Sequence, residues 1–110
     1  MNTLKMIALA ACAVTVLAGP VLAQSASETP ANKEYMAGMD KMHKKMMEAT
    51  DSDPTKSFAK KMVAHHEGAI DMSQTVLKYT KDEEIKKMAN KMISEQQKEV
   101  KELNDWLAKH

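Results

Sequence analysis

The 110-residue sequence has little of what usually stabilises a small domain. It contains one Cys, one Trp, one Phe, two Tyr and three Gly, and its sixteen basic residues are all Lys. A single cysteine excludes an internal disulfide. The scarcity of aromatics and a formal net charge of +1 exclude a strongly basic or base-stacking nucleic-acid binder. The sequence also lacks strand-like alternation of polar and apolar residues. What it has in excess is methionine, with 11 residues.

Residues 1–23 have the organisation of a secretory signal peptide. Lys5 supplies a positive start, residues 6–17 are apolar or small, and Ala23 ends a small-residue cleavage site. The apolar run is too short to span a membrane. An alternative is a lipoprotein anchor at Cys12, but a second apolar run would then be stranded after the cleavage site. We therefore expect a periplasmic protein that retains no membrane span, and no cysteine, after cleavage.

The rest of the sequence divides into a flexible leader, residues 24–31, and a helical domain that extends to residue 110. Apolar residues recur at spacings of three and four, which predicts three helices at about 32–49, 54–79 and 81–109. The predicted fold class is therefore all-α, an antiparallel bundle of three main helices. The apolar face of the second helix is wide enough to contact two neighbours.

Capping residues support these boundaries. Asn32 or Thr29 can cap the first helix, and Asp53 followed by Pro54 is a strong start for the second. Thr80 with Glu83 is predicted to form a capping box for the third. Gly68 lies in the middle of the second helix and costs helix propensity, which predicts a close approach by another helix at that point.

The first predicted helix is unusual because its apolar side is almost entirely methionine. No Leu, Ile, Val or Phe occurs between residues 32 and 49. Methionine commonly fills gaps in cores, but a core of methionine alone specifies packing poorly. Thioether sulfur is also a soft, uncharged ligand that suits Cu(I) and Ag(I). Met36, Met39, His43 and Met47 follow one another at spacings of three and four, so they line one side of the helix.

The second helix carries further soft donors, because Met62, His65 and His66 lie on adjacent turns. In an antiparallel pair, His43 and Met46 could face them. Met88 and Met92 alternate with branched aliphatic residues and fit a core role, and whether they are also ligands stays open. The predicted metal ligands are Met36, Met39, His43, Met46, Met47, Met62, His65, His66 and Met72.

Ligand chemistry narrows the metal to copper. A structural zinc site prefers Cys and His, and calcium and magnesium prefer clustered oxygen donors. A di-iron bundle needs paired Glu-x-x-His motifs, for which the sequence offers only Asp40-x-x-His43. We expect binding of Cu(I), mimicked by Ag(I), with Cu(II) contacts through imidazole, and no enzymatic turnover. The alternatives are a metal-independent, chaperone-like interaction bundle and a non-covalent haem-binding bundle. Surplus apolar surface suggests a homodimer.

The segment Phe58-Ala-Lys-Lys-Met-Val-Ala-His-His-Glu-Gly-Ala-Ile-Asp-Met72, the upstream Met39-Asp-Lys-Met-His43 with Met46-Met47, and the late Gln96-Gln97 and Trp106 resemble one family. This is the domain-of-unknown-function 305 family, with the CopM-like periplasmic Met- and His-rich copper-binding proteins among its members. The resemblance implies a ferritin-like helical fold, export, and a role in copper homeostasis or resistance, with a periplasmic copper-export partner. One departure is Ala64, where the family commonly has Pro before the His pair.

Overall fold

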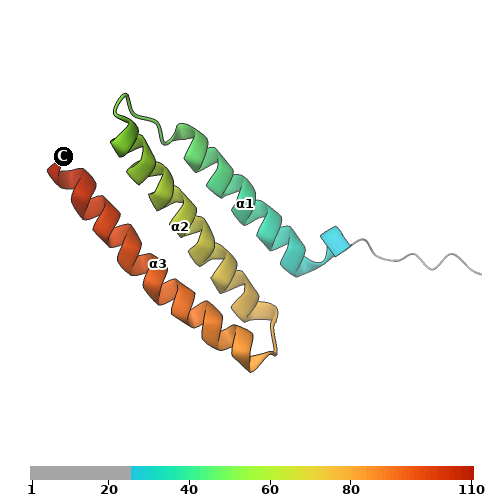
Figure 1. Ribbon diagram of the computed structural model, residues 1–110. Helices are drawn as coiled ribbons and strands as arrows, with labels where there is room; N and C mark the ends of the chain where they lie inside the picture. Colours follow the sequence, from blue (N-terminus) through green and yellow to red (C-terminus); the bar gives the residue numbers. More distant parts are fainter. Residues whose placement is uncertain (1–25) are drawn as a thin grey trace, which may run out of the picture.

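The computed structural model describes residues 26–110, which form three long helices joined by short connections (Figure 1). A 3-10 turn, η1 (Ala26–Glu28), precedes α1 (Pro30–Glu48), and α2 (Pro54–Tyr79) and α3 (Glu83–Lys109) follow. Consecutive helices run antiparallel, and the described part of the chain contains no strand. The predicted all-α antiparallel bundle of three main helices is therefore confirmed. The predicted signal peptide lies outside the described residues.

The three helices form a layer with α2 in the middle. α2 contacts α1 on one side and α3 on the other, whereas α1 and α3 do not contact each other (Figure 1). The prediction that α2 has two neighbours is confirmed. Because the layer is one helix thick, no large side chain among residues 26–110 is fully buried. The buried residues are small ones: Ala59, Ala64, Gly68, Ser73, Thr75 and Ala89.

α1 begins two residues earlier than the sequence predicted, at Pro30. Thr29 is its N-cap, and the Thr29 hydroxyl accepts a hydrogen bond from the Asn32 N–H at 3.3 Å. Proline suits this first position because its missing N–H would have no helical partner there. The turn η1 falls within the segment predicted as a flexible leader, and Lys33 pairs with Glu28 across it at 3.1 Å.

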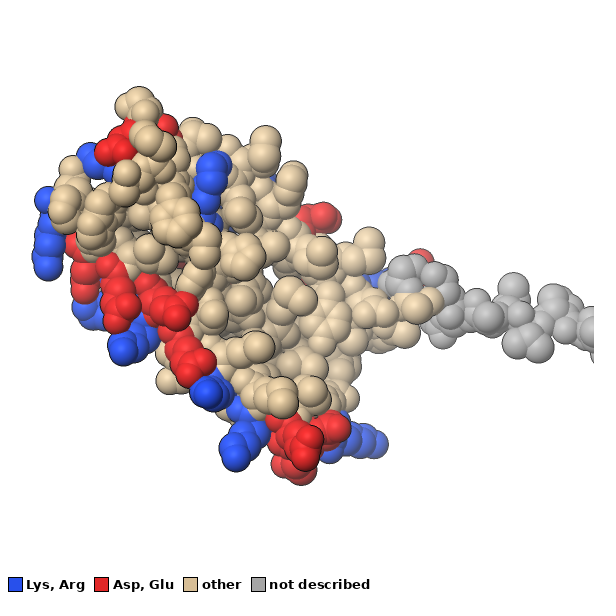
Figure 2. Space-filling model, in the orientation of Figure 1, with Lys and Arg blue, Asp and Glu red and all other residues tan. Residues whose placement is uncertain are grey.

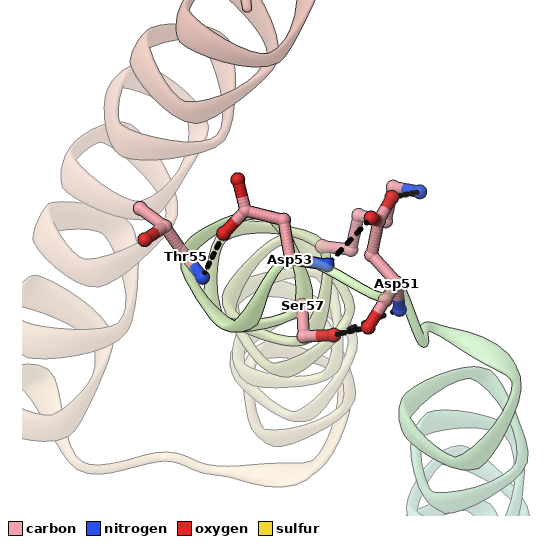
Figure 3. A network of polar contacts seen from close by, with 5 residues as sticks. Asp51, Asp53, Thr55 and Ser57 are labelled. Carbon is pink, nitrogen blue, oxygen red and sulfur yellow. Dashed lines mark hydrogen bonds and ion pairs between the residues drawn. The ribbon is translucent and has the colours of Figure 1, made fainter.

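The connection between α1 and α2 is a compact polar network (Figure 3). The Asp53 carboxylate caps α2 by accepting from the Thr55 N–H at 2.8 Å. Ser57 Oγ accepts from the Asp51 N–H at 2.7 Å and donates to the Asp51 carbonyl at 2.8 Å. Lys60 Nζ lies 2.7 Å from the Asp51 carboxylate and, with the Asp53 N–H, lowers the pKa of Asp51. The predicted Asp53 cap is confirmed.

The start of α3 differs from the prediction. Asp82 is the N-cap, and its carboxylate accepts from the N–H groups of Glu84 and Ile85 at 2.9 and 3.0 Å. The predicted capping box of Thr80 and Glu83 is therefore wrong, and α3 starts at residue 83. An aspartate here serves two free amides at once, and its negative charge suits the positive end of the helix dipole. Thr80 Oγ instead accepts from the Asp82 N–H at 3.1 Å.

α1 and α2 pack closely at Gly68. A Cβ atom built on Gly68 would lie 2.3 Å from the sulfur and 3.0 Å from the Cβ of Met42. The Met42 side chain therefore occupies the space that a side chain at residue 68 would need. The predicted close approach at this glycine is confirmed.

The joint between α2 and α3 is aliphatic. Ala89 is buried and Ile93, Val100, Leu103 and Leu107 are half-buried along the predicted stripe. Towards the start of α3, the same side of the helix is exposed: Ile85, Met88 and Met92 are 39%, 56% and 52% exposed. The core role predicted for Met88 and Met92 is therefore wrong, because in a layer one helix thick no further helix covers this flank of α3.

Candidate metal-binding face

Ion pairs fix which side of α1 faces α2. Lys41 Nζ lies 3.2 Å from the Asp71 carboxylate, and Lys45 Nζ lies 2.5 Å from the Glu67 carboxylate. Lys41 and Lys45 are one turn apart on α1, and their partners are four residues apart on α2. These two ion pairs, together with Met42 against Gly68, define which side of α1 is turned towards α2.

A third connection joins the start of α1 to the end of α2. The Glu34 carboxylate accepts hydrogen bonds from Lys78 Nζ at 2.8 Å and from the Tyr79 hydroxyl at 2.7 Å. These bonds lower the pKa of Glu34, with Lys78 contributing most. The same carboxylate raises the pKa of both Lys78 and Tyr79. The contacts with Lys78 and Tyr79 thus favour the ionised form of the Glu34 carboxylate.

With the ion-paired side of α1 turned to α2, the predicted donors lie on the adjoining side of the helix. Met36, Met39 and Met47 are each half or more exposed, and His43 is exposed among them. Met46 is half-buried. The predicted row of thioethers with one imidazole therefore stands open to solvent along α1, and it is not consumed in packing.

The donors predicted on α2 lie in a different setting from the one expected. Met62 and His66 line a groove of about 370 Å³ between α2 and α3, and His66 is turned to α3. The predicted arrangement, with His43 and Met46 of α1 facing His66 and Met62, is therefore wrong. The physical reason is that the α1 side of α2 is taken by the small and ion-paired residues described above. The groove is lined by Phe58, Met62, His66, Glu99, Glu102, Leu103 and Trp106.

The two ring nitrogens of His66 lie in different surroundings. Its Nε2 lies 2.6 Å from the Glu99 carboxylate, and its side chain is only 12% exposed. Its other nitrogen, Nδ1, is buried and has no hydrogen-bond partner within residues 26–110. Metal-binding imidazoles commonly pair their second nitrogen with a carboxylate, which fixes the ring and its tautomer. With Glu99 on Nε2, Nδ1 is the ring nitrogen that has no partner among the described residues, and it is closed to solvent. His65, by contrast, is exposed, and its ring meets that of His66 edge-on at 6.1 Å.

A second groove, of about 270 Å³, lies towards the other end of the layer. Met72 of α2 and Met88 and Met92 of α3 line it, together with Tyr35 of α1. The remaining lining residues are Ser73, Val76, Ile85 and Ala89, so no charged side chain contributes.

These elements share one face of the layer. Tyr35, in the second groove, is followed at helical spacing by Met39 and His43, while Met72 is preceded by His65 and Phe58 at spacings of seven. Figure 2 shows this face as a broad uncharged surface over all three helices, with Lys, Asp and Glu concentrated at its borders. We call it the methionine face. It comprises Tyr35, Met36, Met39, His43, Met46, Met47, Phe58, Met62, His65, Met72, Met88, Met92 and Trp106.

Thioethers and separate imidazoles are the soft donors that this face presents. Among residues 26–110, no three His, Cys, Asp or Glu side chains gather in a way that could hold a metal ion. Within the same residues, no helix is both long and apolar enough to cross a membrane.

Comparison with protein families decides the relationship that the motifs suggested. The family model described as "Domain of unknown function (DUF305)" matches residues 6–107. The chain belongs to this family. The description of the family names no ligand, so membership settles the relationship and leaves the ligand open.

The chain is also similar to "Uncharacterized protein L153" of Acanthamoeba polyphaga mimivirus. It is 40% identical to this chain over 52 residues. The match covers 47% of this chain and 34% of the viral protein, so the chain spans about a third of that relative's length.

Two features of the face were missed by reasoning from the sequence. Glu99 was not singled out, because a glutamate on an exposed helix face looks like any solvated charge until its partner on another helix is known. Trp106 was noted only as part of the family resemblance, although it lines the groove that holds His66. A sequence signal did exist for both, since Glu99 and Trp106 are seven residues apart and so share one side of α3.

Proposed function

We propose that this protein binds Cu(I), with Ag(I) as its mimic, on the methionine face, and sequesters or carries the ion after export. The observation that carries the proposal is the placement of the exposed methionines together with His43 and His65 on one uncharged face. A helix stabilised only by packing would turn its apolar residues inwards, as α3 does with Val100 and Leu103. α1 instead leaves Met36, Met39 and Met47 half or more exposed.

The donor chemistry fits the ion. Thioethers are neutral and soft, so they bind Cu(I) well and compete poorly for hard cations. A monovalent ion on neutral ligands also costs less to desolvate than a divalent one. We propose that His66 and Met62, which line one groove, add a mixed nitrogen and sulfur site of the kind that can also contact Cu(II). We propose stoichiometric binding in the periplasm, without catalysis, as a contribution to copper homeostasis or resistance.

The α1 donors are tested by anaerobic titration of Cu(I) in competition with a colorimetric chelator. We expect the double variant Met39→Ala, His43→Ala to lose more than about tenfold in affinity at one or more sites. The matched control is Lys44→Gln with Glu48→Gln, which changes two exposed residues one turn apart on the polar side of the same helix. Equal affinity of the wild type and the donor variant would overturn this part of the site.

His66 is tested through its partner. Glu99→Gln keeps the shape of the side chain but removes the charge that orients the imidazole. We expect about 10- to 100-fold weaker Cu(I) binding at that site, because outer carboxylates usually contribute this much. Circular dichroism should show unchanged helicity, and Glu95→Gln on the preceding turn of α3 serves as the control. Unchanged affinity in Glu99→Gln would show that His66 is not a ligand held by Glu99.

A second function has one observation in its favour. Phe58 is 61% exposed beside an open groove, which suits an adaptable surface that holds apolar segments of other proteins. If that were the function, metal-free protein would suppress aggregation of an unfolded client and Phe58→Ser would reduce the effect. Under the copper proposal, Phe58→Ser leaves Cu(I) stoichiometry unchanged.

A further inference from the structure

The groove lined by Met72, Met88 and Met92 is separate from the donors of α1 and from the groove of His66. Met88 and Met92 are one turn apart on α3, so their side chains stack along the helix. Met72 reaches the same groove from α2. All three side chains are 41% exposed or more, so their thioethers can be reached from solvent.

We propose that these three thioethers form a second soft-metal site, an all-sulfur site for one Cu(I) or Ag(I) ion. Three thioethers are a complete ligand set for a d¹⁰ ion of this kind, and they leave a net charge of only +1. The lining has no carboxylate and no imidazole, and its only side-chain oxygens are the neutral hydroxyls of Tyr35 and Ser73, so hydrated divalent cations find no anionic oxygen or nitrogen ligand to replace their water. The inference rests on the proposed function, because both concern the binding of the same class of ion.

The sulfur of Met92 is available for coordination. Ser73 Oγ lies 3.9 Å away, but its single proton is donated to the Ala69 carbonyl at 2.8 Å. The contact therefore leaves the lone pairs of the sulfur largely free. Methionine has three rotatable bonds, so the three side chains can close around an ion without moving the helices. Ala89, which is buried beneath the groove, keeps the floor shallow and the helices close together.

Methyl NMR can observe the site one residue at a time. Protein labelled with ¹³C at the methionine methyl groups is titrated with Ag(I) alone, and resonances are assigned with single Met→Leu variants. We expect the methyl signals of Met72, Met88 and Met92 to shift together and to saturate at the same Ag(I) equivalent. Independent shifts, or no shift in these three signals while others move, would overturn the site.

Stoichiometry gives the second readout. The triple variant Met72→Leu, Met88→Leu, Met92→Leu keeps apolar volume, so it should fold with wild-type helicity. In native mass spectrometry we expect it to bind one Ag(I) fewer than the wild type. The control, Val76→Ile with Ile85→Leu, changes the same groove but no thioether and should keep the wild-type count.

The two proposals fail in different ways. If the wild type binds neither Ag(I) nor Cu(I), the proposed function and this site are both wrong. If the wild type binds ions and the triple variant binds the same number, only the all-sulfur site is wrong. Should the triple variant lose helicity, the single variant Met88→Leu decides, because it is expected to abolish the common shift of Met72 and Met92.

Discussion

The contact between α1 and α2 differs in chemistry from the contact between α2 and α3. Between α1 and α2, the contacts include Met42 against Gly68, two Lys–carboxylate ion pairs, the Glu34 connection and a hydrogen bond from Lys61 Nζ to the Met46 carbonyl. Between α2 and α3, they are half-buried aliphatic side chains around buried Ala89. The one charged contact on that side, His66 with Glu99, lies at the border of a groove.

This difference explains how α1 can be rich in methionine and yet leave most of it exposed. A helix that docks through ion pairs and one close contact needs few apolar residues for packing. Met42 supplies that contact, and the other methionines of α1 remain on the methionine face. Stability of the α1 joint and metal binding should therefore respond to different substitutions, and the predictions below test that separation.

The largest effect is expected at the close contact in the α1 joint. Gly68→Leu places a side chain where Met42 lies, so we expect a loss of about 1–3 kcal/mol in unfolding free energy, typical of overpacking. Leucine has good helix propensity, so the loss would be steric. Urea denaturation followed by circular dichroism measures it.

The matched control is the other glycine of this joint. A Cβ on Gly38 would meet only the Asp71 Cβ, at 4.0 Å, which is ordinary contact. Gly38→Ala should therefore stabilise the protein by up to about 1 kcal/mol through helix propensity alone. A stabilising Gly68→Leu, or a strongly destabilising Gly38→Ala, would show that the close approach is somewhere else.

The contrast at these two glycines also shows what the sequence could predict. A glycine in mid-helix indicates close packing, and three helices with their antiparallel order follow from periodicity and caps. Which capping residue is used does not follow, because Thr80 and Asp82 are both good caps, and Asp82 is chosen by its reach to two amides.

The site was harder to predict than the fold, because periodicity gives faces but not partners. Helical spacing separates the methionine side of α1 from the side that carries Lys41 and Lys45. It could not tell that α2 turns His66 towards α3, because this depends on which side of α2 each neighbour occupies. The exposure of Met88 and Met92 has the same cause, since the helix that would cover them is absent from a three-helix layer.

The next prediction compares the aliphatic joint with the methionine row. Leu103→Ala removes half-buried apolar surface between α2 and α3, so we expect a loss of about 1 kcal/mol. Met36→Ala on α1 removes a side chain that is 54% exposed, and the expected change is within about 0.5 kcal/mol. Thermal melting of both variants without metal measures the difference. Comparable losses would mean that α1 methionines do contribute to packing.

The smallest effect is expected from pH, and it is confined to the α1 joint. Hydrogen bonds from Lys78 and then Tyr79 lower the pKa of Glu34 in the folded state. A carboxyl group with a lowered folded pKa stabilises the fold above its unfolded pKa, and the contribution is lost as pH falls through the folded pKa. Between neutral pH and pH 3, the melting temperature of the wild type should therefore fall slightly more than that of Glu34→Gln. Because Asp51 and Asp105 also have lowered pKa values and are present in both proteins, their contribution cancels in the comparison.

Salt should reduce this difference in melting temperature, since the Glu34–Lys78 pair is exposed and screened. An identical acid response in the two proteins would show that the Lys41 and Lys45 ion pairs and Gly68 hold α1 in place without the Glu34 connection.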